Sequence, residues 1–229
     1  MRPRVVIHNA VSLDGRVTGF EVDMRCYYSL VPTWKEDATL CGSGTILAAP
    51  EGRVRDKDEP GPRRRPEAGD RRPLLVVADS RGRVRCWSML LSAGLWRDGV
   101  ALCSCRTPAR HVEYLRRRGV GRIVAGASRV DLAGAFESLR TRYRVRTVRV
   151  DSGGTLNAAL LRAGLVDEVS LLVHPVLAGT AARPLFDSVK PLRTEFKLYR
   201  QQRLPDGLVW LRYRWQKRDR GREEGIEEE

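Results

Sequence analysis

The sequence predicts an α/β protein whose central sheet is mostly parallel and carries an antiparallel hairpin at its C-terminal side. Apolar runs alternate with amphipathic stretches along the chain, which is typical of parallel strands joined by crossover helices. The pattern is clearest where a β-branched run at 145–150 meets a glycine turn, a helical stretch and a second apolar run at 169–173. Near the end, runs at 197–203 and 208–215 flank Pro205-Asp206-Gly207 and predict the hairpin.

The other elements follow from the same two periodicities. Short apolar runs predict strands at residues 4–11, 38–41, 74–78, 99–104 and 122–125. Apolar residues at helical spacing predict helices at 108–118 and 131–143, and a short third helix carries Leu156, Leu160 and Ala163 on one face. Gly119 and Gly164 are placed to end the first and last of these helices. Residues 22–37 are mixed and predicted only partly helical, and residues 46–49 continue as a helical turn or loop.

One domain is expected over residues 1–218, with a charged flexible loop at about 51–72 and a charged tail at 219–229. The loop is dense in proline, glycine and charge, and Val54 is its only large apolar residue, so it cannot bury a core. We therefore expect the loop to be dispensable for folding. Arg63-Arg64-Arg65 could bind an anion, but charge blocks in such segments are commonly just solvated.

The chain is strongly basic: among 229 residues, 42 Lys plus Arg against 28 Asp plus Glu give a net charge of +14. A basic balance suits nucleic acids, and it also suits phosphorylated substrates and cofactors. The arginines are spread along the chain, and no predicted helix carries a single basic stripe. The interleaving of aromatic and basic residues that stacks bases is also missing, so a nucleic-acid partner is disfavoured.

Nothing in the sequence predicts a membrane span or a metal site. No run approaches the ~20 apolar residues of a span, and the apolar segment at the N-terminus is too short for a signal peptide. We therefore expect a cytoplasmic protein with no membrane partner. The five cysteines form no CxxC motif and have no adjacent histidine, which favours reduced thiols over zinc or disulfides. The histidines, His8, His111 and His174, show no spacing that would bring them together.

Two glycine turns after predicted strands are candidate sites for a nucleotide phosphate. Gly153 and Gly154 precede a helix, where phosphates can approach the backbone and the free helical N–H groups favour anions. A branched side chain at Gly154 is therefore expected to block the ligand and leave the core intact. Gly42-Ser43-Gly44-Thr45 could face this turn across a shared ligand. For both, a plain turn without a ligand is the alternative.

A third candidate follows the strand at 74–78, where Ser80, Arg81 and Arg83 come in close succession. A hydroxyl and two guanidinium groups at a strand end could hold a phosphate, such as the 2′-phosphate that distinguishes NADP from NAD. A Rossmann-type dinucleotide fold is nevertheless excluded, because no GxGxxG fingerprint follows the first strand.

Four motifs in chain order carry a family resemblance. They are SLDG at 12–15, GSGT at 42–45, VVADS at 76–80 and DSGGTLN followed by GLVDEVSLLVHPVLAG within 151–179. Together they resemble the reductase domain of riboflavin biosynthesis, which occurs alone in archaea and fungi and fused to a deaminase in bacteria. The resemblance spans roughly residues 4–215, and its most specific part is the stretch 153–179.

The resemblance implies a dihydrofolate reductase-like three-layer fold, NADPH as hydride donor and a homodimer. By position, the family's cofactor contacts fall on Ala10, Thr45, Ser80 and the turn formed by Gly153, Gly154, Thr155, Leu156 and Asn157. Gly42 and Gly44 of the first glycine turn are further candidates for cofactor binding. The family's acidic residue near the substrate matches Asp151. Asp151 or Asp14 could orient the ribosyl hydroxyls or relay a proton, with a plain turn former as the alternative for Asp14. Arg25, or Arg53 or Arg55, could grip a substrate phosphate.

The chain departs from the family mainly in the substrate half of the site. The family has Glu and then Gly where Asp151 and Ser152 stand here, and a shorter carboxylate could still reach the substrate. Ala49 occupies the place of a cofactor-contacting Asp four residues after Thr45, and the Leu-Thr-x-Arg that follows in the family is missing. The Arg–Ala ahead of the GxGT strand is also absent, and Thr33 and Trp34 lie near that point.

The function implied is an NADPH-dependent reductase like 5-amino-6-(5-phosphoribosylamino)uracil reductase. It would reduce the ribosyl group of a phosphorylated diaminopyrimidine or aminouracil to ribityl. The first alternative is a reductase of the same fold acting on another pteridine-like or carbonyl substrate, which the lost Asp and Arg positions favour. The second alternative is a basic nucleic-acid-binding protein.

Overall fold

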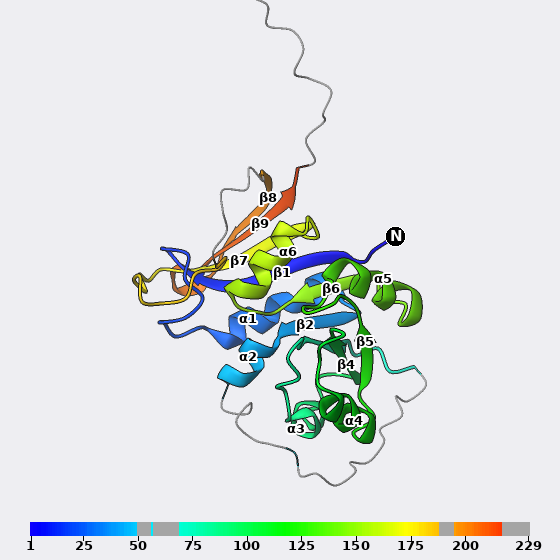
Figure 1. The fold of residues 1–229 in the computed structure, drawn as a ribbon. Coiled ribbons are helices and arrows are strands. Elements are labelled where there is room, and N and C mark those ends of the chain that lie inside the picture. Colours follow the sequence, from blue (N-terminus) through cyan, green and yellow to red (C-terminus); the bar gives the residue numbers. More distant parts are fainter. Residues whose placement is uncertain (50–55, 57–68, 188–194, 217–229) are drawn as a thin grey trace, which may run out of the picture.

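The structure is a computed structural model that describes residues 1–49, 56, 69–187 and 195–216. Its centre is one nine-stranded sheet with the order β5-β4-β3-β2-β6-β1-β7-β9-β8 (Figure 1). Every pairing from β5 to β7 is parallel, while β9 runs antiparallel to both β7 and β8. The predicted fold class is therefore confirmed: a mostly parallel sheet that ends in an antiparallel hairpin.

The helices and strands of the structure agree with those predicted from the sequence, except that one helix was not predicted. The strands are β1 (Arg4–Ser12), β2 (Ala38–Gly42), β3 (Leu74–Ala78), β4 (Asp98–Cys103), β5 (Gly121–Val124), β6 (Thr147–Val150), β7 (Glu168–His174), β8 (Phe196–Arg203) and β9 (Val209–Trp215). The helices are α1 (Met24–Leu30), α2 (Ser43–Ala48), α3 (Trp87–Ser92), α4 (Ala109–Arg117), α5 (Leu132–Arg142) and α6 (Gly154–Arg162), with 3-10 turns η1 (Val31–Trp34) and η3 (Pro205–Gly207). The sequence patterns missed α3, because its six residues are too few to show a helical period.

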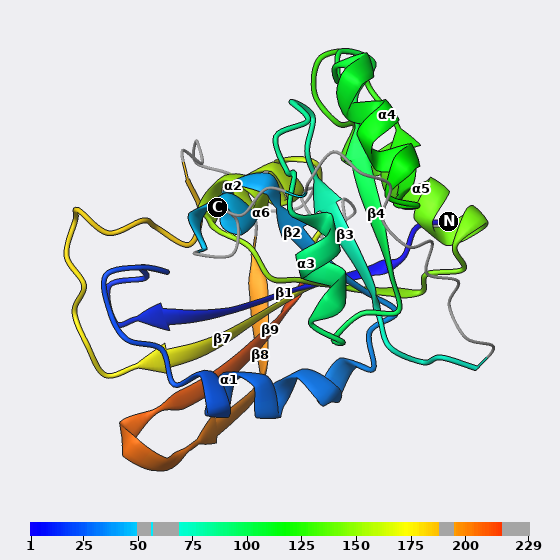
Figure 2. The same cartoon turned by 90° about the horizontal axis from the view of Figure 1, so that it is seen from below.

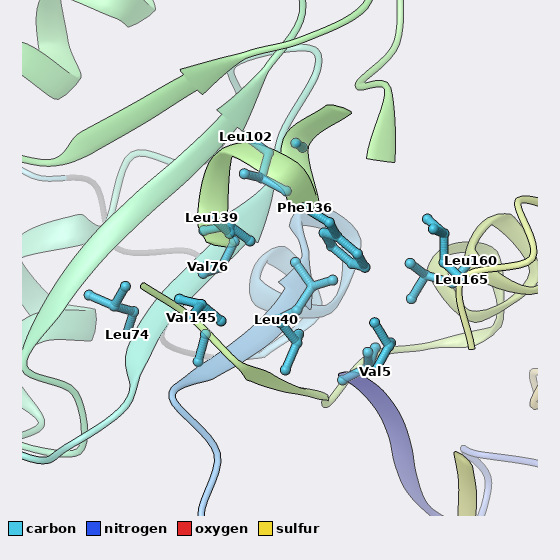
Figure 3. Close-up of a cluster of buried hydrophobic side chains, with 14 of the residues drawn as sticks. Val5, Leu40, Leu74, Val76, Leu102, Phe136, Leu139, Val145, Leu160 and Leu165 are labelled. Atoms are coloured by element: carbon cyan, nitrogen blue, oxygen red, sulfur yellow. The ribbon is translucent and has the colours of Figure 1, made fainter. Parts of the chain in front are cut away.

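One face of the sheet is covered by α5 and α6. Phe136 and Leu139 of α5 and Leu160 of α6 are fully buried against strand residues such as Val5 and Leu40 (Figure 3). Their spacing of three and four residues puts them on one side of each helix, as the sequence predicted. None of the helices that the structure describes is long and apolar enough to cross a membrane.

The opposite face carries two separate apolar clusters. In one, Tyr27 of α1 and Trp34 of η1 pack over β1, β7 and β9. In the other, Trp87 and Leu115 pack over residues of β3 and β4. These two side chains come from α3 and α4, which lie beside β3 and β4 in Figure 2. The strip of sheet between the two clusters belongs to β2 and β6, and it is polar.

We call this strip the polar row, and it consists of Glu36, Thr39, Arg149 and Asp151. Thr39 on β2 and Arg149 on β6 are paired in register, and Arg149 joins the other members by hydrogen bonds. Side chains two residues apart on a strand lie on the same face, so Arg149 and Asp151 both belong to this side. The row ends at Asp151, directly after the last residue of β6.

The parallel strands bring their carboxyl ends to one edge of the sheet. Gly42 ends β2, Ala78 ends β3 and Val150 ends β6, so the predicted glycine turns after β2 and β6 lie at the same edge. Ligands of open α/β sheets bind outside the carboxyl ends of the strands. This edge is therefore where a site is expected, and the polar row leads up to it.

The expectations for the charged loop and the tail fall mostly outside the described residues, as does Arg63-Arg64-Arg65. Asp56 is described, and its side chain is almost fully buried, at 4% exposed. Its carboxylate accepts hydrogen bonds from the Ser88 backbone N–H at 3.0 Å and from the Tyr114 hydroxyl at 2.6 Å. Burial and this contact with Asp56 raise the pKa of Tyr114. Asp56 thus satisfies a free N–H in the first turn of α3 and joins that helix to α4.

We expect Asp56→Ala to lower the free energy of unfolding by about 1–3 kcal/mol, because it strips a buried cap and leaves the Tyr114 hydroxyl without an acceptor. Asp56→Asn should cost less, since an amide oxygen still accepts one bond. Urea denaturation of the three proteins measures the difference. An Asp56→Ala protein within about 0.5 kcal/mol of the wild type, the range of ordinary surface changes, would show that this contact is not formed.

Candidate functional site

A cavity of about 580 Å³ lies at the carboxyl edge of the sheet. The turns after β2, β3 and β6 form its walls, and the segment 183–187 closes another side. Most of the residues expected to contact a cofactor line it, namely Gly42, Gly44, Thr45, Ser80, Gly153, Gly154, Thr155 and Leu156. The structure therefore brings the two predicted glycine turns together around one space.

Two hydroxyl groups join the glycine turns to each other. The Ser152 Oγ accepts a hydrogen bond from the Gly42 backbone N–H at 3.1 Å and lies 3.1 Å from the Thr45 Oγ1. The Thr45 Oγ1 in turn accepts from the Gly153 backbone N–H at 3.2 Å. Ser152, where the family has glycine, therefore fixes the distance between the first turn of α2 and the turn before α6.

A buried amide pair supports the second turn from behind. Asn157 donates from Nδ2 to the Asn9 Oδ1 at 3.0 Å, and Asn9 donates to the Ser152 carbonyl at 2.9 Å. Asn157 also lies within 3.2 Å of the Leu185 carbonyl, which belongs to the loop after β7. Asn157 is fully buried and does not line the cavity, so its side chain holds the turn. Ala10, also expected at the cofactor, lies in the apolar cluster under α1 instead.

Gly153 and Gly154 of the second turn differ in whether the structure has room for a side chain. A Cβ on Gly154 would lie 2.4 Å from the Pro184 carbonyl oxygen and 2.9 Å from the Asp187 nitrogen, both backbone atoms. A Cβ on Gly153 would meet only the Thr45 Oγ1 at 4.0 Å. The expectation that a side chain at Gly154 would spare the core is therefore wrong, because the segment 183–187 packs directly on this residue. Gly153 is the position open to the cavity.

Three arginines line the cavity: Arg83, Arg129 and Arg183. Arg83 donates to the Ser43 Oγ at 3.1 Å, and none of the three forms an ion pair with any residue in the described part of the chain. The lining also contains the carboxylate of Asp187, so three arginines against this acid leave an excess of positive charge that suits an anion with several oxygens.

Ser80 serves this cluster through its hydroxyl, which accepts from the Val130 N–H at 2.9 Å and so holds the loop that bears Arg129. Arg81, named beside Ser80 from the sequence, is exposed and does not line the cavity. Arg129 and Arg183 were missed by the sequence analysis. Both stand in irregular loops, where no period or strand end marks a residue as part of a site.

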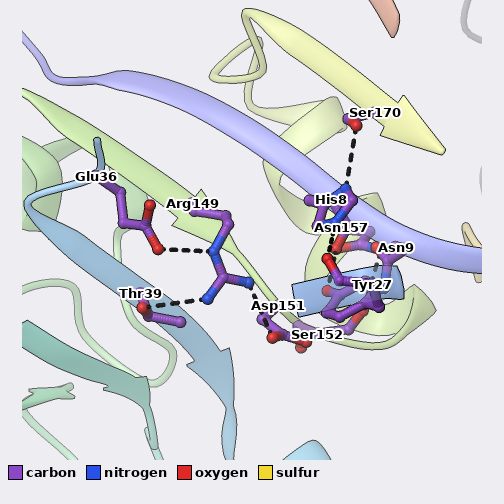
Figure 4. Close-up of polar contacts among 10 residues, drawn as sticks. All are labelled: His8, Asn9, Tyr27, Glu36, Thr39, Arg149, Asp151, Ser152, Asn157 and Ser170. Atoms are coloured by element: carbon purple, nitrogen blue, oxygen red, sulfur yellow. Dashed lines mark hydrogen bonds and ion pairs between the residues drawn. The ribbon is translucent and has the colours of Figure 1, made fainter. Parts of the chain in front are cut away.

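Asp151 is the last member of the polar row (Figure 4), and it does not line the cavity itself, whereas its neighbour Ser152 does. Arg149 donates from NH1 to the Asp151 Oδ2 at 2.9 Å and from Nε to the Glu36 Oε1 at 2.9 Å, and its NH2 lies 3.4 Å from the Thr39 Oγ1. Burial works against the charge on Arg149, but Asp151 and Glu36 outweigh it and raise its pKa. At 28% exposure of its side chain, Asp151 is the most exposed of the three charged members of the row.

The other titratable groups around Asp151 are held neutral by burial. Burial, and after it the charge on Arg149, lowers the pKa of His8 from 6.5 to about 4. Burial also raises the pKa of the Tyr27 and Tyr28 hydroxyls and of the Cys41 thiol, with Asp151 adding to each shift. At neutral pH the His8 ring, the two tyrosine hydroxyls and the Cys41 thiol are therefore uncharged.

Asp14 and Arg25 do not reach the cavity. Asp14 accepts hydrogen bonds from the Ser12 hydroxyl at 2.6 Å and from the backbone N–H groups of Ala178 and Gly179 at 3.0 and 2.9 Å. The Ser12 bond, followed by the Ala178 bond, holds the pKa of Asp14 well below its usual range. A carboxylate engaged in this way anchors the loop after β7 and does not suit a proton relay. Arg25 is exposed on α1.

No three His, Cys, Asp or Glu side chains of the described residues gather closely enough to hold a metal ion.

Comparison with known proteins gives concordant matches. The family model described as the RibD C-terminal domain matches residues 3–210. The 2,5-diamino-6-ribosylamino-4(3H)-pyrimidinone 5′-phosphate reductase of Archaeoglobus fulgidus is 30% identical over 219 residues, which cover 91% of this chain and 97% of that protein. The protein of the same name from Methanothermobacter thermautotrophicus is 32% identical over 196 residues, covering 82% and 85%. The crystal structure of a pyrimidine reductase-like protein from Corynebacterium diphtheriae has a TM-score of 0.71 at 21% identity, covers 94% of this chain and 93% of its own, and shows the shared fold.

The two glycines of the second turn should respond differently to the same small change. Gly154→Ala should lower the free energy of unfolding by about 1–3 kcal/mol, because the new methyl group meets backbone atoms of the segment 183–187. Gly153→Ala should leave stability within about 0.5 kcal/mol of the wild type, since its φ of −83° and ψ of 178° are open to any residue. Thermal and urea unfolding of both variants measure this. Equal stability of the two would mean that the contact with Pro184 is absent.

Because His8 is buried and uncharged, we expect its protonation to lower the free energy of unfolding in acid. Its ring stacks on Tyr27, lies 3.1 Å from the Ser170 Oγ and 3.4 Å from the Tyr27 carbonyl, and is fully buried. Its pKa of about 4 lies below the ordinary 6.5, so the unfolded chain binds the proton first. This contribution to stability is complete above pH 6.5 and is lost as the pH falls toward 4.

Between pH 7 and pH 4.5 the wild type should therefore lose ~2 kcal/mol more than His8→Gln, which has no imidazole to protonate. Urea denaturation at the two pH values gives the loss of stability of each protein. Subtracting the loss of His8→Gln from that of the wild type cancels the contributions of the carboxylates, which the two proteins share. Identical losses in the two proteins would show that His8 titrates normally in the folded state.

Proposed function

This chain belongs to the RibD C-terminal domain family, and from that membership we propose that it is an NADPH-dependent reductase of 2,5-diamino-6-ribosylamino-4(3H)-pyrimidinone 5′-phosphate. The observation that carries the proposal is the cavity at the carboxyl edge of the sheet. It brings together two glycine turns and three arginines that form no ion pair with any described residue. Asp151 does not line the cavity, but it directly precedes Ser152, which does, and its side chain is 28% exposed. This combination suits a phosphorylated dinucleotide on one side and a polar sugar on the other.

The reaction converts a ribosylamine into a ribitylamine. The bond between C1′ and the ring oxygen opens to give an imine and a free 4′-hydroxyl, and a hydride with its electron pair then reduces C1′ while the nitrogen takes a proton. NADPH supplies that hydride when it is bound and leaves as NADP⁺. The protein must hold the two reactants in register, and this positioning accounts for most of the catalysis in such a transfer.

The residues of the cavity divide this work. Backbone N–H groups at the start of α6 can hold the diphosphate, because Gly153 has no side chain to block its approach. Arg83 and Arg129 offer charge for the 2′-phosphate, and Ser80 holds the loop that carries Arg129. These roles suit NADPH better than NADH, since a 2′-phosphate is where the two cofactors differ.

Asp151 serves the substrate in this proposal. It stands at the end of the polar row beside Ser152, which lines the cavity, and its side chain is partly exposed. A carboxylate here can orient the ribosyl hydroxyls or manage the proton that the nitrogen takes up. Arg25, exposed on α1, stays a proposed contact for the substrate phosphate. Arg53 and Arg55, the other candidates, lie outside the described residues.

A homodimer belongs to the same proposal. Most of the apolar run in β7 is buried within the sheet, but beyond its end Val176 and Leu177 are 38% and 77% exposed. Leu13, whose backbone N–H bonds to the Val176 carbonyl, is 62% exposed beside them. A second copy could cover this surface. A nucleic-acid-binding role gains no support, because the matches to reductases run along nearly the whole chain.

The proposed reaction is tested by incubating the purified protein with the ribosylaminopyrimidine 5′-phosphate and NADPH and following NADPH absorbance and the ribityl product. Asp151→Asn should lower kcat by about 10²-fold, because the amide cannot act as an acid or base, while the Kd for NADPH stays within about twofold. Glu137→Gln, an exposed acid on α5, is the control and should match the wild type. Turnover only with a different pteridine-like or carbonyl substrate would replace the substrate assignment and keep the reductase.

The cofactor preference is tested at the arginines. Arg83→Ala and Arg129→Ala should each weaken NADPH binding by about tenfold and leave NADH binding unchanged, because only NADPH offers a 2′-phosphate. Arg81→Ala is the matched control, since Arg81 is a neighbouring arginine that does not line the cavity. Titration of nicotinamide fluorescence measures each Kd. A loss at Arg81 alone, or equal losses for both cofactors, would remove the proposed role of Arg83 and Arg129.

A further inference from the structure

Arg149 is an unusual residue for the middle of a parallel sheet. It lies on β6 between Val6 of β1 and Thr39 of β2, and its side chain is only 5% exposed. Burying an unpaired guanidinium in such a place would be strongly unfavourable. A buried charge of this kind is tolerated when its N–H groups are satisfied, and Arg149 achieves this with three separate partners.

Two of the three partners fix the orientation of the guanidinium independently of its contact with Asp151. Glu36, 7% exposed, holds the Nε, and Thr39 approaches the NH2, so the plane of the group is set by residues on the far side from the cavity. The remaining NH1 then points to the Asp151 Oδ2 at 2.9 Å. The planar fork of arginine makes this possible, because its donors have a fixed geometry that a lysine lacks.

Asp151 has a particular need for such support. It follows the last residue of β6 and is more exposed than either of its two charged neighbours, at 28%. It is also shorter than the Glu that the family carries at this place, so a small rotation moves its carboxylate out of reach of a substrate. An error of about 1 Å in the position of a reacting group can cost ~10²-fold in rate.

We infer that Arg149 is a positioning residue of the reductase proposed above, which holds the Asp151 carboxylate in a single orientation toward the substrate. The inference rests on the proposed function for what Asp151 does, and on the hydrogen bonds of the polar row for how it is held. Glu36 forms a second ion pair with the guanidinium of Arg149. This pair keeps the guanidinium buried and compensated when a substrate approaches Asp151.

Two variants of the polar row test the inference. Arg149→Lys keeps a cation that can reach only one carboxylate at a time, and it should lower kcat by about tenfold. The double variant Arg149→Met with Glu36→Gln removes the guanidinium without leaving Glu36 buried and unpaired, and it should lower kcat by about 10²-fold. In both, the KM for the substrate and the Kd for NADPH should stay within about threefold, because the effect falls on the reacting geometry.

Arg212→Lys is the matched control. The side chain of Arg212 is also buried in the same sheet, at 8% exposed, and pairs with the buried Glu168 at 2.7 Å. It lies on β9, at a distance from the cavity, so its loss should reduce stability and leave kcat unchanged. Crystal structures supply a readout that does not need turnover: one Asp151 conformer in the wild type and in Arg212→Lys, and a displaced or split Asp151 in the two polar-row variants.

Folded polar-row variants with wild-type kcat and an unmoved Asp151 would overturn the inference. An equal fall of kcat in Arg212→Lys would also overturn it, because the loss would then reflect general destabilisation. If the wild type itself does not reduce the ribosylaminopyrimidine phosphate, the proposed function fails instead. The position of Asp151 in the crystal structures then still decides whether Arg149 holds it.

Discussion

The parallel direction of the strands from β5 to β7 is the constraint on which the site depends. It sends the ends of β2, β3 and β6 to one edge, so turns that are more than 100 residues apart in sequence, such as those at Thr45 and Gly153, can meet. The same arrangement places the helices of one face, α5 and α6, over a continuous apolar cluster. The other face is interrupted by the polar row, which gives the substrate side of the proposed site its charge.

The fold could be predicted well because its signals are local. The run Leu74–Ala78 is uniformly apolar and lies between Pro73 and Asp79, and the strand has those bounds in the structure. Leu160 and Phe136 were correctly assigned to buried helix faces, since helical spacing alone identifies them. The helix α3 could not be found this way, because it is short and its first turn is capped by Asp56, a residue 32 positions earlier. A capping residue so far away in the sequence cannot be recognised from the residues next to the helix.

The site could be predicted only where backbone chemistry is visible in the sequence. The glycine turns were identified by composition, and most of their residues line the cavity. The reason for Gly154 was misjudged, because the contact that excludes a side chain comes from Pro184, in a loop with no signal of its own. Arg129 and Arg183 were missed for the same cause. Asp14 shows the converse: its turn chemistry was evident, but its backbone partners at 178 and 179 depend on tertiary structure.

The joined hydroxyls of Thr45 and Ser152 have a consequence that follows from counting protons. Each oxygen already accepts one backbone N–H, from Gly153 and from Gly42 respectively. The two hydroxyl groups contain two hydrogens in total. The hydrogen bond between the hydroxyls takes one of these hydrogens, whichever group is the donor. The second hydrogen is therefore left over, on one oxygen or the other, and both oxygens belong to residues that line the cavity. The pair acts as a two-position donor that can present its spare hydrogen to an anionic ligand from either side without moving a heavy atom.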